Sequence, residues 1–65
     1  MGQWDEIKRV AVGIIRRKGR VYASDVWRTG KVYYSPEWIH KIMRRMDEAG
    51  ELRWAGKRLG FVLPE

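Results

Sequence analysis

The stretch SPEWIHKIMRRMDEAGEL, residues 35–52, carries the clearest structural signal in the chain. Ser35 followed by Pro36 is a typical helix start. The serine hydroxyl can accept a hydrogen bond from a free backbone N–H group, and the fixed φ of proline suits the first helical position. Gly50 supplies the left-handed residue at which helices commonly end. The pattern predicts a helix over residues 35–49.

The side chains of this helix divide into an apolar and a charged side. The apolar ones recur every three or four residues, which predicts a buried stripe made of Ile39, Ile42, Met43 and Met46. At about 100° per residue, the centre of the opposite side holds Glu37, Lys41, Arg44 and Glu48, flanked by Trp38 and Arg45 and by His40 and Asp47. We expect this charged side to face outward, with His40 a surface side chain near Asp47.

Upstream, apolar residues at helical spacing predict an amphipathic helix over residues 4–18. Val12 falls on its polar side, where it is either a single exposed apolar residue or part of a self-association face. A short strand is expected at residues 20–22. A short helix is expected at residues 24–29, capped by Ser24. The candidates for burial on this short helix are Val26 and Trp27.

Downstream, residues 51–54 and 59–63 read as two strands around a glycine-containing loop at residues 55–58, which predicts a β-hairpin. Period-two alternation turns a defined set of side chains inward: Leu52, Trp54, Leu59, Phe61 and Leu63. Arg53 is then expected to point outward.

Composition limits the class of protein. Sixty-five residues allow one domain, residues 1–65, and without cysteine it must be held together by packing. A net charge of +6 and a pI near 10.2 favour a polyanionic partner, nucleic acid before an anionic membrane surface. Charge interrupts every apolar run too early to cross a bilayer, and the amino terminus lacks signal-peptide character, so we expect a cytoplasmic protein.

The order helix, short strand, short helix, longer helix and hairpin resembles the winged helix-turn-helix family over essentially the whole chain, most closely at residues 35–52. The resemblance implies an α+β fold of three helices, with a small antiparallel sheet formed by the short strand and a C-terminal hairpin wing. It also implies a small transcriptional regulator that binds double-stranded DNA. The 35–49 helix would enter the major groove, and the 55–58 wing tip would touch the backbone or minor groove.

Within this hypothesis Arg44 and Arg45 are the best candidates for base contacts, since a guanidinium can bond guanine through two parallel hydrogen bonds. Lys41 supplies a movable charge for phosphate or base. On the wing, Lys57 and Arg58 are expected at the phosphate backbone. Three further candidates are Ser35, Trp38 and Arg53. Ser35 would act through the helix N-terminus, and Trp38 either closes the core or lies at an interface. Additional DNA contacts are considered at Arg28, Lys31, Tyr33, Tyr34 and His40.

Alternatives remain open. Glu37 to Lys41 and Arg44 to Glu48 are spaced for ion pairs within the helix, so the charged side could be merely solvated. The domain could then be a winged-helix protein-interaction module without DNA binding. RNA or single-strand binding through stacked aromatic residues is a third option. Useful DNA specificity would call for a homodimer or a partner protein.

Catalysis has little support in the sequence. His40 is the single histidine, cysteine is absent, and neither metal-ligand spacing nor a phosphate-binding glycine loop occurs. We therefore expect a protein that is not an enzyme and has no catalytic residue, cofactor, metal or small-molecule substrate.

Overall fold

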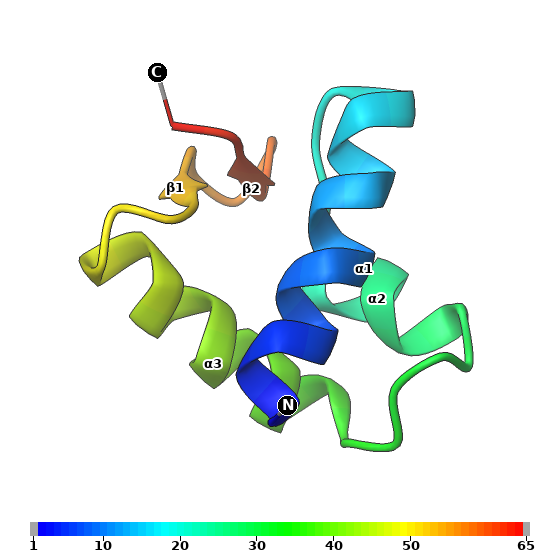
Figure 1. Cartoon of the computed structure of the whole chain (residues 1–65). Helices are drawn as coiled ribbons and strands as arrows, with labels where there is room; N and C mark the ends of the chain where they lie inside the picture. Colours follow the sequence, from blue (N-terminus) through cyan, green and yellow to red (C-terminus); the bar gives the residue numbers. More distant parts are fainter. Residues whose placement is uncertain (1, 65) are drawn as a thin grey trace.

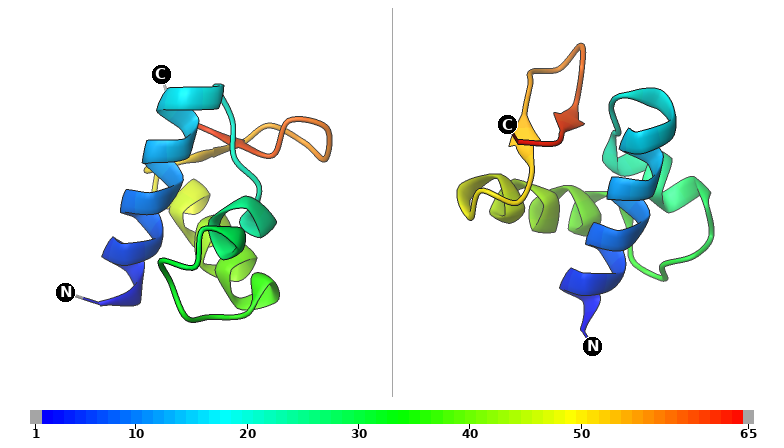
Figure 2. Two further views of the ribbon diagram at one scale, coloured as in Figure 1. Left: turned by 90° about the vertical axis from the view of Figure 1, so that its right-hand side faces the viewer. Right: turned by 45° about the horizontal axis from the view of Figure 1, so that its top comes forward.

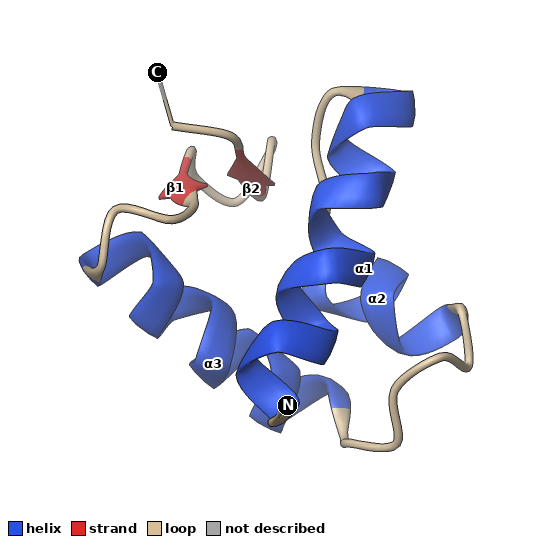
Figure 3. Ribbon diagram, viewed as in Figure 1, coloured by secondary structure: helices blue, strands red, loops and turns tan. Residues whose placement is uncertain are grey.

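The computed structural model describes residues 2–64, so the two end residues of the predicted 1–65 domain lie outside it. Three helices are followed by a two-stranded antiparallel sheet (Figures 1 and 3). The elements are α1 (Gln3–Lys18), α2 (Ala23–Arg28), α3 (Pro36–Glu48), β1 (Arg53–Trp54) and β2 (Phe61–Val62). The predicted α+β class is confirmed.

Helix α1 matches the predicted 4–18 helix to within a residue. Its buried residues are Ile7, Ala11, Ile14 and Ile15. Val12 is not a freely exposed side chain, because it is partly buried and packs against the core.

Helix α2 begins one residue before its predicted start, and its cap differs from the expected one. The cap residue is Tyr22, whose backbone N–H donates to Asp25 Oδ2 at 2.9 Å. Ser24 is exposed inside the helix, so its assignment as the cap was wrong. Val26 is fully buried as predicted, whereas Trp27 is 50% exposed and its predicted burial was wrong. A helix of six residues turns only a narrow face to the core.

Helix α3 begins and ends where the sequence predicts. Ser35 Oγ accepts a hydrogen bond from the backbone N–H of Trp38 at 3.2 Å. The whole predicted stripe is buried: Ile39, Ile42, Met43 and Met46. The right panel of Figure 2 shows α3 passing behind α1, and the buried stripe of α3 and the buried face of α1 belong to one core.

The hairpin, residues 53–62, has shorter strands than predicted. Arg53 pairs with Val62 and Trp54 with Phe61. Alternation thus holds only near these pairs: Leu52 and Phe61 are buried and Trp54 is partly buried. Leu59 lies in the turn and Leu63 lies beyond the last pair, where they are 46% and 37% exposed, so their predicted burial was wrong.

The predicted strand at residues 20–22 is reduced to one bridge between Val21 and Phe61. The N–H of each residue donates to the carbonyl of the other, at 2.9 and 2.8 Å. Gly60 makes this approach possible. Its φ is +73°, and a Cβ atom there would lie 2.5 Å from the carbonyl oxygen of Val21. The hairpin is consequently joined to the segment between α1 and α2.

Aromatic residues surround the core more than they fill it. Phe61 is fully buried at the centre with Ile7, Ile39 and Met43. The four tryptophans lie at the edges of the core or on the surface. Among residues 2–64, no charged or polar side chain is buried, and no helix has the length and apolar character needed to cross a bilayer.

Candidate nucleic-acid interface

The outward side of α3 is charged, as the helical spacing predicted. Lys41, Arg44 and Arg45 are all exposed, and Glu37 and Glu48 are exposed at the two ends of the same side. Trp38 borders this surface and is 39% exposed. Its indole N–H donates to the side-chain oxygen of Gln3, so Trp38 covers the start of α1 and stays outside the core.

Two of these cations stand over indole rings. Lys41 Nζ lies 5.7 Å from the centroid of Trp38, and the guanidinium carbon of Arg44 lies 5.3 Å from that of Trp54. Such contacts are worth about 0.5–1 kcal/mol at exposed sites. In the described part of the chain the one ion pair joins Lys8 to Glu51, so the ion pairs that the spacing allowed along α3 are not formed.

The flank of α3 that faces the hairpin is built around Trp54. The Trp54 ring is tilted on Phe61 with centroids 4.8 Å apart, and the His40 ring meets both rings edge-on at 5.6 and 5.7 Å. Asp47 Oδ1 accepts a hydrogen bond from the backbone N–H of Trp54 at 3.1 Å. His40 is therefore half-buried in an aromatic contact, not the simple surface side chain that was predicted.

The tip of the hairpin presents Lys57 and Arg58, both exposed. Figure 2 shows this turn projecting away from the helices in both views. The hydroxyl of Tyr22 donates to the backbone carbonyl of Lys57 at 2.9 Å and also to that of Arg58. Sequence reasoning missed Tyr22, and a tyrosine 35 residues before its partner leaves no local signal by which to find it.

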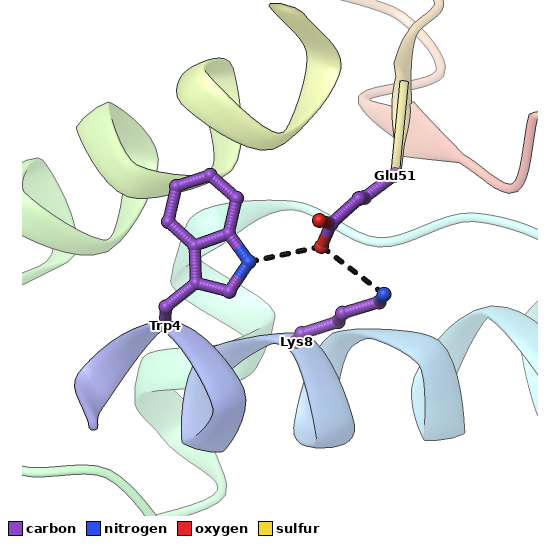
Figure 4. Close-up of polar contacts among 3 residues, drawn as sticks. All are labelled: Trp4, Lys8 and Glu51. Carbon is purple, nitrogen blue, oxygen red and sulfur yellow. Dashed lines mark hydrogen bonds and ion pairs between the residues drawn. The ribbon is translucent and has the colours of Figure 1, made fainter. Parts of the chain in front are cut away.

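A second attachment holds the start of the hairpin to α1. Figure 4 shows Trp4 and Lys8 pointing toward Glu51, which lies between α3 and β1. Glu51 Oε1 accepts a hydrogen bond from Trp4 Nε1 at 2.9 Å and pairs with Lys8 Nζ at 3.1 Å. The hydrogen bond from Trp4, with that from Lys8, lowers the pKa of Glu51 below its ordinary 4.5.

The other predicted contacts are dispersed. Arg53 is exposed on β1 as expected, and Tyr33 is 91% exposed in the loop before α3. Tyr34 instead packs against the core, and its hydroxyl donates to Glu6 Oε1 at 3.1 Å. Burial raises the pKa of Tyr34, as do this hydrogen bond and the negative charge of Glu6. Arg28 and Lys31 line hollows against α1.

Trp54 connects the hairpin to α3, because its ring lies under Arg44 and its backbone pairs with Phe61. The six basic residues on these elements are Lys41, Arg44, Arg45, Arg53, Lys57 and Arg58. Of the four acidic residues from α3 to β1, Asp47 and Glu51 are engaged in holding the hairpin, which leaves Glu37 and Glu48. Cations outnumber the remaining carboxylates on these elements, which makes their local potential positive.

Comparisons of the chain with protein-family models, with curated proteins and with solved structures found no match. What is established is an α+β domain of three helices and a two-stranded sheet that carries this cationic surface.

Proposed function

We propose that the chain is a small winged helix-turn-helix protein that binds double-stranded DNA and serves as a transcriptional regulator. In this proposal α3 enters the major groove and the hairpin is the wing, with Lys57 and Arg58 on the phosphate backbone. The observation that carries the proposal is that Lys41, Arg44 and Arg45 of α3 make no ion pair with described acidic residues. Lys41 and Arg44 lie over tryptophan rings and Arg45 is exposed, so all three are available to an external anion.

The α3 cations differ in the DNA contacts that their chemistry allows. Arg45 and Arg44 can each form two parallel hydrogen bonds with a guanine edge, whereas Lys41 offers a point charge. The contact with Trp54 limits the motion of Arg44, and less side-chain entropy is then lost on binding. Ser35 caps α3, and the positive end of the helix dipole there would favour a DNA phosphate.

The hairpin attachments favour a wing of fixed position. Tyr22 holds the tip, the Val21 bridge holds β2, and Glu51 holds the start of the hairpin to α1. A positioned pair of cations binds phosphate at lower entropic cost than a loose loop does. One domain still makes few base contacts, so sequence specificity is expected to involve a second copy or a partner protein.

The test is fluorescence anisotropy of labelled random-sequence duplex DNA, titrated with protein at low and then at physiological salt. Two double variants are compared, Arg44→Ala with Arg45→Ala and Lys57→Ala with Arg58→Ala. We expect both to bind more weakly, and the log–log salt slope to fall by about 0.9 for each phosphate that the variant no longer neutralises. Circular dichroism would verify that each variant is folded.

The matched control is Arg16→Ala with Arg20→Ala, which removes the same charge from exposed positions outside α3 and the hairpin. We expect this control to retain most of the affinity. If the affinity for DNA falls equally in the control and the test variants, net charge alone accounts for the binding. Preferential competition by single strands would favour the single-strand alternative. Absence of binding at low salt would favour the protein-interaction alternative.

A further inference from the structure

A groove runs between α1 and α2 and is not used by the proposed DNA interface. Its larger hollow, about 310 Å³, is lined by residues that include Arg9, Gly13 and Lys31. An adjoining hollow of about 210 Å³ includes Lys18 and Arg28. The two hollows share Ile14, Arg17 and Thr29, so they form one continuous α1–α2 groove.

The groove and the α3 surface lie on different sides of α1. At about 100° per residue, Arg9, Gly13 and Arg17 fall on the side of α1 opposite Trp4 and Lys8, which contact Glu51. Figure 1 and the right panel of Figure 2 agree, with α2 on one side of α1 and the sheet on the other.

The rim of the groove is strongly basic. Its five cations, all exposed, are Arg9, Arg17, Lys18, Arg28 and Lys31. The one acidic lining residue, Asp25, already accepts the hydrogen bond from the backbone of Tyr22. None of the five cations forms an ion pair within residues 2–64. The rim therefore complements a partner that carries carboxylates or other anions.

The floor is apolar and includes an unexplained glycine. Ile14 is buried and Val10 is partly buried, so both can contact an apolar side chain placed in the groove. Gly13 lies in the middle of α1, where glycine destabilises a helix relative to alanine. A Cβ atom at this position would meet nothing within 4 Å, so packing inside the chain does not require glycine. Gly13 leaves the helix surface open to close approach from outside.

We propose that the α1–α2 groove binds a segment of a partner protein that combines acidic with apolar residues. Apolar side chains of the segment lie against Val10, Gly13 and Ile14, and its carboxylates pair with the arginines and lysines of the rim. A nucleic acid fits less well, since no aromatic side chain lines the groove for bases to stack on and the floor is apolar. The inference does not depend on DNA binding by α3.

The test begins with selection from a library of random peptides displayed against the intact protein. We expect the selected peptides to be enriched in Asp and Glu together with aliphatic residues. A synthetic copy of one selected peptide is then titrated into ¹⁵N-labelled protein. The amide signals that shift are expected at Gly13, Ile14, Thr29 and Lys31, and not on α3 or the hairpin.

Two variants with matched controls complete the test. Arg17→Glu is expected to weaken peptide binding about tenfold or more, whereas Arg16→Glu, the same charge change outside the groove, has a much smaller effect. Gly13→Gln should also weaken binding while the thermal midpoint stays the same or rises. Gly13→Ala, with a smaller side chain, should weaken it less.

Several results would overturn the proposal: peptides without acidic residues, shifted amides confined to α3 or the hairpin, or equal effects of Arg17→Glu and Arg16→Glu. Displacement of the peptide from the groove by duplex DNA would assign the groove to nucleic acid instead. The substituted residues, Gly13 and Arg17, are not among the candidate DNA contacts, so failure here is distinguishable from failure of that proposal.

Discussion

Replacing Gly60 with alanine tests whether the Val21 bridge holds the hairpin to the helices. Gly60 has a φ of +73°, and a Cβ atom at this position would lie 2.5 Å from the carbonyl oxygen of Val21 and 2.9 Å from the ring of Tyr22. A backbone carbonyl cannot move aside as a flexible side chain can. The substitution must therefore separate Val21 from the hairpin.

The expected cost has two parts. A non-glycine residue in the left-handed region costs about 1–2 kcal/mol. Separation also breaks the two hydrogen bonds between Val21 and Phe61, each with a net worth of about 0.5–1.5 kcal/mol. We expect Gly60→Ala to lower the free energy of unfolding by about 2–5 kcal/mol. A domain of this length has only about 3–10 kcal/mol in total.

The measurement is urea unfolding followed by tryptophan fluorescence, with Gly56→Ala as the matched control. Gly56 lies in the same turn and has a φ of +98°, but a Cβ atom there would meet nothing within 4 Å. This control should lose only the conformational part, about 1–2 kcal/mol. If the two variants unfold at the same urea concentration, the close approach of Val21 to Gly60 is refuted as a source of stability.

Three further predictions concern single side chains. Glu51→Gln should lower the thermal midpoint at neutral pH, because the folded pKa of Glu51 is lowered and its carboxylate stabilises the fold above pH 4.5. The difference in thermal midpoint between the variant and the wild type should shrink as pH falls below 4.5 through that lowered pKa. A difference in thermal midpoint that stays constant in a calorimetric pH series would contradict this. Tyr22→Phe should leave the fold intact but weaken duplex DNA binding up to about tenfold, since its hydrogen bonds to the hairpin tip are removed; unchanged affinity in the anisotropy assay would argue against a positioned tip. Val26→Ala should lower the free energy of unfolding in urea by about 1–3 kcal/mol, because Val26 is fully buried. Trp27→Ala should lower it less, although the side chain removed is larger, because Trp27 is half exposed. A larger loss for Trp27→Ala than for Val26→Ala would contradict the packing of α2.

Features with local causes could be predicted from the sequence. The start of α3 follows from Ser35 and Pro36, and its buried stripe follows from spacing alone. The same argument located α1 and the outward cations of α3. Each of these features depends on residues within a few positions of one another, which is the range over which helical geometry acts.

Features that depend on distant partners were missed or mistaken. The partners Trp4 and Glu51, or Tyr22 and Lys57, are separated by 47 and 35 residues, and no spacing rule relates them. Burial of Leu59 was wrong because alternation was extended beyond the two paired residues of each strand. The cations of α3 could be named from the sequence, but their partners could not, since the indole of Trp54 comes from another element.

The bridge between Val21 and Phe61 has a consequence for synthesis of the chain. Phe61 is fully buried, yet a ribosome adds it only after all three helices have been synthesised. The three helices emerge earlier, but the position that Phe61 fills in their shared core stays empty until the hairpin has left the exit tunnel. A short isolated helix is marginally stable in water. We therefore expect this domain to fold in one step after translation of the hairpin, with the core between the helices incomplete until then.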